Sequence, residues 1–453
     1  MKKGRGQFVT KLGVIAATVG SAVGLGNIWR FPYEAGVNGG GAFLVVYLLC
    51  VFVIGVPAMI AEFSIGRASH SNARNAFRAL KPGGRYHYVA YLGILGAVLI
   101  LSFYSVVAGW IVEYLYQAAA GGLSGLSAGE LAQAFGEFTA DPVRSVLWTL
   151  LFLAVNHIVT SRGVERGIER VSNVLMPLLF LILIALCVKS LTLSRATEGL
   201  NFLFNADFSK LTPGVVLGAM GQAFFSLSLG ATVLMTYASY FSDSTPLVRS
   251  ATVIAALDTV VALLAGIIIF PAVFSFGLEP TAGPKLVFET LPAVFLQMPG
   301  GSLWLVAFFA LLFFASLTST ISMSETAISF LSEERGLSRG AATGITTGVA
   351  MALGAVCALS FGVLGGLKIF GLTVFELFDF VASNIILPIG GMGCSLFVGW
   401  VVDRKIVDAQ LTNFGQRRIT LAAPIRFCMR FVAPVCIALI FLYGLGLLGF
   451  VAG

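Results

Sequence analysis

The stretch Ser21-Ala-Val-Gly-Leu-Gly-Asn-Ile-Trp-Arg-Phe-Pro32 decides the fold. It begins inside an apolar segment, residues 10–30, which is long enough to cross a hydrocarbon core about 30 Å thick. Gly20, Gly24 and Gly26 interrupt this segment where a continuous helix would favour leucine or alanine. The pattern predicts a membrane-spanning helix that is broken near its middle.

The remainder of the chain is equally apolar. Of its 453 residues, 58% are hydrophobic and 11% are charged, and the mean hydropathy is +0.94. A soluble domain could not cover that much apolar surface. Continuous apolar runs such as residues 178–188 also lack the alternation of a membrane barrel. We therefore predict an all-α integral membrane protein, and neither the cysteines nor the histidines show metal-site or disulfide spacing.

Eleven membrane spans are expected along the chain. Their approximate bounds are 10–30, 41–66, 88–119, 143–161, 170–193, 213–240, 248–276, 301–332, 337–363, 370–402 and 423–450.

The basic residues orient these spans. All but seven of the 28 lysines and arginines fall in the N-terminal segment and the loops on its side of the membrane. The seven exceptions are Arg30, Arg144, Lys189, Arg195, Lys210, Lys285 and Lys368. The positive-inside rule then predicts a cytoplasmic N-terminus and an external C-terminus. It also explains the net charge of +7 without nucleic acid, and no obligate protein partner is indicated.

A second interruption lies five spans after the first, at Ser226, Ser228 and Gly230. Paired breaks in two five-helix halves predict an inverted repeat with a binding site at mid-membrane. The alternative is that small residues only allow close helix packing. We expect one transport domain, residues 1–453, with repeats at about 10–193 and 213–402 and an extra helix at about 423–450.

Carboxylates inside predicted spans are costly and therefore indicate function. The deepest are Glu62, Asp258, Glu325 and Asp379, although Asp379 could instead be a charge at the N-terminus of a helix. Asp258 has no basic residue nearer in sequence than Arg249, so a fixed cation, a proton or Na⁺ must compensate it.

Hydroxyl groups gather in the eighth span. Thr318 and Ser319 follow Ala315 by one turn, where they could share a cation with its carbonyl. Back-bonding within the helix is the alternative reading.

The opening stretch and the following Asn38-Gly-Gly-Gly-Ala-Phe43 resemble the signature of the bacterial neurotransmitter:sodium symporters. The resemblance extends through residues 222–230, 315–320 and 378–380. It implies the leucine-transporter fold, with a 5+5 inverted repeat, discontinuous first and sixth spans and an eleventh helix. It also implies sodium-coupled amino-acid import by alternating access through a bacterial plasma membrane, without an organic cofactor.

The resemblance assigns two Na⁺ sites. The first would take Ala22, Asn27, Ser226 and Asp258, and the second Gly20, Val23, Ala315, Thr318 and Ser319.

It also assigns the substrate and the gates. Substrate would contact Ala22, Val23, Leu25, Gly26, Ile100, Tyr104, Phe225, Ser226, Ser228, Ala231, Ser319 and Met323. The gates would be Arg30 with Asp379 outside, and Arg5 with Glu333 near Tyr240 inside.

Departures from the family pattern refine this picture. Chloride-dependent members have Asn and Ser where this chain has Asp258 and Ala262, so Asp258, with Glu62, would substitute for chloride. Amine carriers place Asp at the position of Gly24, so an amino acid is expected rather than a monoamine. Ala231 enlarges the pocket, which favours a large hydrophobic or aromatic L-amino acid. If neighbouring side chains refill that space, the substrate would instead be small and neutral.

The sequence leaves two other functions open and argues against a third. A proton-coupled carrier would use Glu62 or Asp258 as the titrating group. A channel-like or sensor protein could use the same polar groups without coupling. An enzyme would need a nucleophile, a base and a metal at convergent spacing, and the sequence shows no such set.

Overall fold

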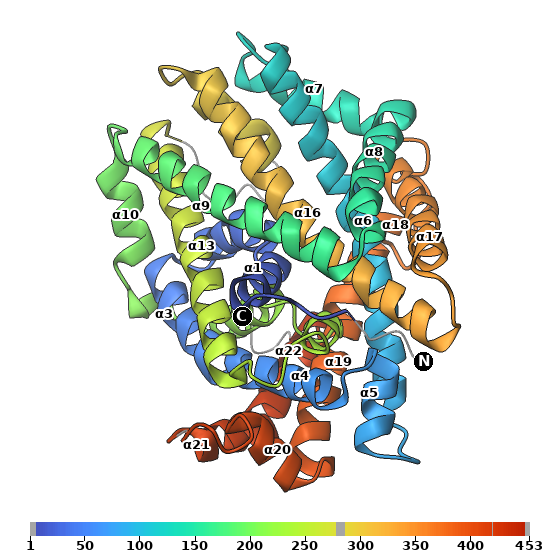
Figure 1. Cartoon of the computed structure of the whole chain (residues 1–453). Helices are drawn as coiled ribbons and strands as arrows, with labels where there is room; N and C mark the ends of the chain where they lie inside the picture. Colours follow the sequence, from blue (N-terminus) through green and yellow to red (C-terminus); the bar gives the residue numbers. More distant parts are fainter. Residues whose placement is uncertain (1–5, 278–285, 419, 449–453) are drawn as a thin grey trace.

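The computed structural model describes residues 6–277, 286–418 and 420–448 as helices joined by loops (Figure 1). Within these ranges nine helices are long and apolar enough to cross a membrane. They are Gly41–Ser69 (α3 and α4), His87–Ala120 (α6), Pro142–Ser161 (α8), Val164–Leu191 (with α9), Leu247–Ser275 (α13), Gly301–Glu334 (α16), Arg339–Leu359 (α17), Val374–Val401 (α18 and α19) and Ala422–Gly444 (α21 and α22).

The first expected span is broken. Helix α1 (Lys11–Ala22) ends where Val23 adopts an extended conformation, and helical structure resumes over Gly26–Val37, which ends in α2. The two parts are bent by 52° and form a tenth span if they are counted together. Thr10 begins α1, because its side chain accepts a hydrogen bond from the Gly13 amide.

The expected total of eleven spans is not reached by length and apolarity alone. Residues 213–240 are divided between α11 (Pro213–Ser226) and α12 (Val233–Ala238), and neither part approaches the ~20 residues that a spanning helix needs. The predicted second break is the reason for the difference.

Left-handed backbone marks this second break. The φ angles are 54° at Ser228, 89° at Gly230 and 56° at Thr232, a conformation that is costly for residues with a side chain. At Gly230 a Cβ atom would also collide with the carbonyl of Leu387. The break is thus packed tightly against α19 (Leu387–Leu396).

Both breaks are enclosed by protein. Helix α1 packs against α9 (Arg170–Leu191), α13 and α16, and Figure 1 shows it among these helices in the middle of the bundle. Unpaired backbone groups are tolerated at membrane depth only in such an environment.

Short helices complete the described part: α5 (Ala73–Leu80), α7 (Ala128–Ala140), α10 (Ala196–Phe204), α15 (Leu291–Leu296) and α20 (Arg404–Leu411).

Candidate functional site

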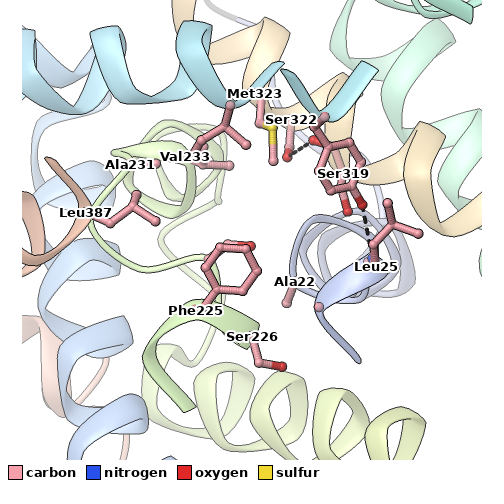
Figure 2. Close-up of a pocket in the computed structure, with 15 residues that line it drawn as sticks. Ala22, Leu25, Phe225, Ser226, Ala231, Val233, Ser319, Ser322, Met323 and Leu387 are labelled. Atoms are coloured by element: carbon pink, nitrogen blue, oxygen red, sulfur yellow. Dashed lines mark hydrogen bonds between the residues drawn. The ribbon is translucent and has the colours of Figure 1, made fainter. Parts of the chain in front are cut away.

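A cavity of about 40 Å³ lies between the two breaks (Figure 2). The break of the first span presents its backbone here, since the Leu25 amide donates to the hydroxyl of Tyr104 at 3.0 Å. No charged side chain lines the cavity. Its lining consists of Ala22, Gly24, Leu25, Gly26, Ile100, Tyr104, Phe225, Ser226, Ser228, Ala231, Val233, Ser319, Ser322, Met323 and Leu387.

The structure gathers the residues that were assigned to the substrate, with one exception. Val23 does not line the cavity. Its side chain is buried elsewhere, and its carbonyl accepts a hydrogen bond from Ser319 at 3.2 Å. The reason is the extended backbone at Val23, which turns the residue away from the cavity.

Four residues line the cavity that the sequence did not assign to the substrate. They are Gly24, Val233, Ser322 and Leu387. Helical periodicity could have found Ser322, because it lies one turn after Ser319 on α16. Leu387 is one apolar residue among many on α19, and nothing in the sequence distinguishes it.

A first polar cluster, Asn27, Ser226 and Asp258, lies beside the cavity. The side-chain amide of Asn27 donates to Ser226 Oγ at 2.9 Å and to Asp258 Oδ1 at 2.8 Å. Ser226 Oγ donates to Asp258 Oδ2 at 2.6 Å. Among the described residues Asp258 forms no ion pair, although it is completely buried. Ala22, the fourth expected member, ends α1 and lines the cavity together with Ser226.

A second polar cluster, Gly20, Val23, Ala315, Thr318 and Ser319, joins α1 to α16. Ser319 Oγ reaches the carbonyl oxygens of Val23 at 3.2 Å and Gly20 at 3.4 Å. Thr318 Oγ1 lies 3.1 Å from the carbonyl of Ala315. It also bonds the carbonyl of Phe314 at 3.0 Å, the back-bond of an ordinary helical threonine.

The oxygen atoms of both clusters are suitable ligands for a hard monovalent cation. Carbonyl and hydroxyl oxygens at broken helices can replace the hydration shell of Na⁺. The first cluster adds one carboxylate, whereas the second offers neutral oxygens only.

A vestibule of about 390 Å³ adjoins the cavity and shares Leu25, Gly26, Tyr104 and Phe225 with it. Arg30 and Asp379 both line the vestibule, but the structure shows no ion pair between them. The Arg30 guanidinium lies 4.3 Å from the centroid of the Phe225 ring, and its Nε atom is 3.7 Å from Glu34. Asp379 instead accepts a hydrogen bond from Ser383. The expected contact between Arg30 and Asp379 is therefore not formed, because each side chain has another partner.

The expected inner gate is described only in part, since Arg5 lies outside the described residues. Glu333 accepts hydrogen bonds from the backbone amide of Asn72 at 2.8 Å and from its side chain at 3.0 Å. The Tyr240 hydroxyl donates to Glu325 at 2.6 Å.

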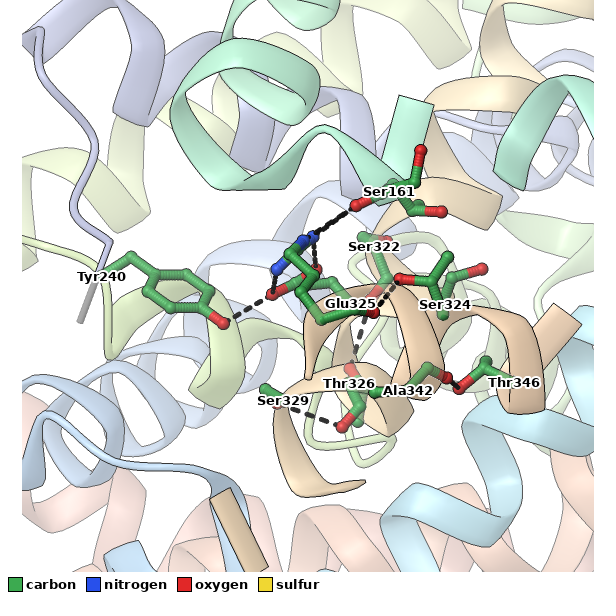
Figure 3. A network of polar contacts seen from close by, with 12 residues as sticks. Ser161, Tyr240, Ser322, Ser324, Glu325, Thr326, Ser329, Ala342 and Thr346 are labelled. Atoms are coloured by element: carbon green, nitrogen blue, oxygen red, sulfur yellow. Dashed lines mark hydrogen bonds and ion pairs between the residues drawn. The ribbon is translucent and has the colours of Figure 1, made fainter. Parts of the chain in front are cut away.

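Glu325 is the centre of a buried network (Figure 3). Arg339 forms an ion pair with it at 2.6 Å and donates to the carbonyl of Thr160. The network therefore connects α8, α16 and α17 with Tyr240, which follows α12. The sequence indicated a functional role for Glu325 but not these partners, because Tyr240 is 85 residues away and Arg339, 14 residues away, lies on the next helix.

Glu62 contacts the second break. Its Oε1 atom accepts the Gly230 amide at 2.7 Å, while its Oε2 atom is buried without a hydrogen-bond partner. Glu62 and Asp258, which the sequence groups as a substitute for chloride, share no hydrogen-bond partner in the described structure. Only Asp258 belongs to the first polar cluster.

Comparisons with known proteins agree over most of the chain. Residues 5–129 and 138–448 match the Sodium:neurotransmitter symporter family. An uncharacterized sodium-dependent transporter of Bacillus subtilis, YhdH, is 40% identical over 98% of both chains. A similar protein of Haemophilus influenzae is 36% identical over 98% of this chain and 99% of its own.

A solved structure extends this likeness to the fold. The crystal structure of MhsT in complex with L-phenylalanine superposes with a TM-score of 0.90 at 43% identity. It covers 97% of this chain and 100% of MhsT. The predicted leucine-transporter fold is thereby confirmed. The chain belongs to the sodium:neurotransmitter symporter family, and it is a multi-pass, sodium-dependent membrane transporter rather than an enzyme.

Proposed function

We propose that this transporter imports a neutral L-amino acid with a large hydrophobic or aromatic side chain, together with two Na⁺ ions and without chloride. One observation carries the proposal: an uncharged cavity lies between the backbone of the broken first span and a cluster whose carboxylate, Asp258, forms no ion pair in the described structure. Backbone amides suit the carboxylate of an amino acid, and the carboxylate of Asp258 suits Na⁺. We place the protein in a bacterial plasma membrane with a cytoplasmic N-terminus and an external C-terminus.

The carboxylate of the substrate would bind the Leu25 and Gly26 amides together with the Tyr104 hydroxyl, which already accepts the Leu25 amide. Its ammonium would bind carbonyls of Ala22, Phe225 and Ser226. The space around Gly24 favours an amino acid over a monoamine, since amine carriers place Asp at this position. A Cβ atom at Gly24 would lie 2.8 Å from Ser319 Oγ and 3.0 Å from the Tyr104 hydroxyl. No acidic side chain fits there without displacing both.

The side chain of the substrate would lie against Ile100, Ala231 and Met323, under the ring of Phe225. A cavity of about 40 Å³ holds a few water molecules rather than an aromatic ring. Binding must therefore move side chains, and Met323 is suited to this because its unbranched side chain repacks easily. MhsT, which binds L-phenylalanine, supports an aromatic substrate by its similarity.

The first polar cluster would hold one Na⁺ next to the substrate, and the second cluster would hold the other. Sodium would compensate Asp258, which has only neutral donors around it. Because that compensation leaves no need for an anion, transport would be independent of chloride.

Alternating access would close the vestibule by bringing Arg30 to Asp379, which line its wall together. On the other side, opening of the inner gate expected at Arg5 and Glu333 would accompany the loss of the Tyr240 bond to Glu325.

Uptake into proteoliposomes tests the proposal. An inward Na⁺ gradient should accumulate L-phenylalanine above equilibrium, and a sodium ionophore should abolish the accumulation. Replacement of chloride by gluconate should leave uptake unchanged. Competition by all twenty amino acids then defines the substrate, and a preference for glycine or alanine would refute the large side chain. Accumulation driven by a proton gradient without Na⁺ would refute sodium coupling.

A further inference from the structure

A separate cavity, of about 270 Å³, lies between residues 398–407 and residues 426–431 and shares no lining residue with the substrate cavity. Three arginines line it, Arg404, Arg426 and Arg430. By the positive-inside rule this end of the protein faces the cytoplasm. Gly399, which lines the cavity, lies directly against the backbone of Arg430, so the two segments are in close contact here.

The charges in this cavity are not balanced. Asp408 pairs with Arg426 and lies 3.6 Å from Arg404, so one carboxylate serves two guanidinium groups. Arg430 has no acidic partner in the described parts of the chain, and its guanidinium lies 3.9 Å from the centroid of the Trp400 ring. The opposite charges of Asp403 and Lys405, which flank Arg404 in the sequence, cancel each other. An excess of positive charge therefore remains for an external anion.

An apolar stripe leads away from the cavity along the last helix. Phe427, Phe431, Val435 and Leu439 are 58%, 42%, 60% and 38% exposed. Their spacing of four residues places them on one face of the continuous helix Ala422–Gly444. Only 28% of the apolar window of this helix is buried, so the stripe faces lipid.

We propose that this cavity binds the anionic headgroup of a phospholipid, whose acyl chains lie along the stripe. Arginine pairs with phosphate through two parallel hydrogen bonds. Trp400, which is 54% exposed, adds the aromatic side chain that is typical of the membrane interface. Basic pockets between helix ends on the cytoplasmic side are suited to such headgroups. A free phosphate ion would explain the arginines but not the stripe, and a second copy of the chain would explain the stripe but not the arginines.

Native mass spectrometry of the full-length protein in detergent tests the proposal. Phosphatidylglycerol should be retained more strongly than phosphatidylcholine. The double variant Arg404→Gln/Arg430→Gln should weaken phosphatidylglycerol retention by about 25-fold, at about fivefold for each arginine. The matched control is Arg195→Gln, which removes an exposed arginine elsewhere. L-phenylalanine binding should be equal in all three proteins, which shows that they are folded.

Four results would overturn the proposal. One is equal retention of the two lipids, and another is undiminished phosphatidylglycerol retention in the double variant. The third is inorganic phosphate that displaces phosphatidylglycerol at equal concentration, since the site would then recognise the free anion. A dimer that persists after both lipids are removed would assign the stripe to a second copy and would equally contradict the proposal.

Discussion

Asp258 and Glu325 are both completely buried carboxylates, yet only Glu325 has a cation beside it. Arg339 pairs with Glu325, and the Tyr240 hydroxyl donates to it. In the described part of the chain, the side chain of Asp258 accepts hydrogen bonds from Asn27 and Ser226, which are neutral. A buried charge without a partner is costly. The protein therefore compensates Glu325 with its own arginine, whereas the charge of Asp258 is left to a bound cation or a proton. Na⁺ is the cation that we propose there.

The variant Glu325→Gln should have the largest effect of all, a decrease in the stability of the folded protein. It leaves the Arg339 guanidinium without a carboxylate, and removal of one partner of a buried pair costs about 3–5 kcal/mol. Because the Arg339 side chain is 30% exposed, we expect the lower end of that range. Thermal unfolding in detergent should occur several degrees lower. Glu165→Gln, at an exposed site, is the control, and an unchanged unfolding temperature would show that the pair is not structural.

The variant Asp258→Asn should act on ion binding instead. Loss of the charged ligand, worth about 1.5–3 kcal/mol, should weaken Na⁺ binding roughly 10- to 100-fold. Without Na⁺ its unfolding temperature should not fall, because the variant removes an uncompensated charge. The Na⁺ dependence of L-phenylalanine binding measures the first effect, and the exposed Asp207→Asn is the control. An unaltered Na⁺ dependence would remove Asp258 from the sodium site.

A double variant sharpens this contrast. Asp258→Asn combined with Ala262→Ser supplies a neutral amide and a hydroxyl one turn later, as in chloride-dependent relatives. Uptake should then require chloride, whereas the unmodified protein should not. Uptake by the double variant in gluconate at the rate seen in chloride would show that the carboxylate does not replace an anion.

The variant Gly24→Ala tests whether the region near Asp258 binds the substrate. Its new Cβ atom would lie 2.8 Å from Ser319 Oγ and 3.0 Å from the Tyr104 hydroxyl, so one of them must move. Overpacking costs about 1–3 kcal/mol, which corresponds to roughly 5- to 150-fold weaker L-phenylalanine binding. Gly348→Ala, where no heavy atom lies within 4 Å of the new methyl group, is the matched control. Equal binding by both variants would argue against a substrate beside Gly24.

The variant Thr318→Val should have the smallest effect, because the second polar cluster has no charge. Loss of one hydroxyl ligand, about 1 kcal/mol, should weaken Na⁺ binding about fivefold. Thr252→Val removes the same kind of helical back-bond on an exposed face and should change nothing. If the two variants behave alike, the Thr318 hydroxyl serves only its own helix.

Local chemistry explains why the sequence predicted as much as it did. Spanning helices follow from long apolar runs, and the broken spans follow from glycines and serines at positions where helix propensity is poor. The family resemblance then identified the residues that would contact the substrate. All of them except Val23 line the cavity. The bounds of the two repeats, the sodium assignments and the orientation in the membrane stay predictions.

The polar contacts were harder to anticipate. Nothing near Arg30 in the sequence indicates that its guanidinium lies over Phe225 rather than beside Asp379. The distance between those two side chains depends on how far α18 stands from the first span, and a small shift of packed helices makes or breaks the contact.

The sequence by itself determined the class of protein, the two breaks and the polar residues that surround them, because hydropathy and backbone propensity act over a few residues. Only the tertiary structure decided which buried carboxylate receives a cation. Arg339 is 14 residues from Glu325 in the chain, whereas Asn27 reaches Asp258 across 231 residues. Such pairings depend on the relative positions of whole helices, and the packing that sets those positions is cooperative across the bundle.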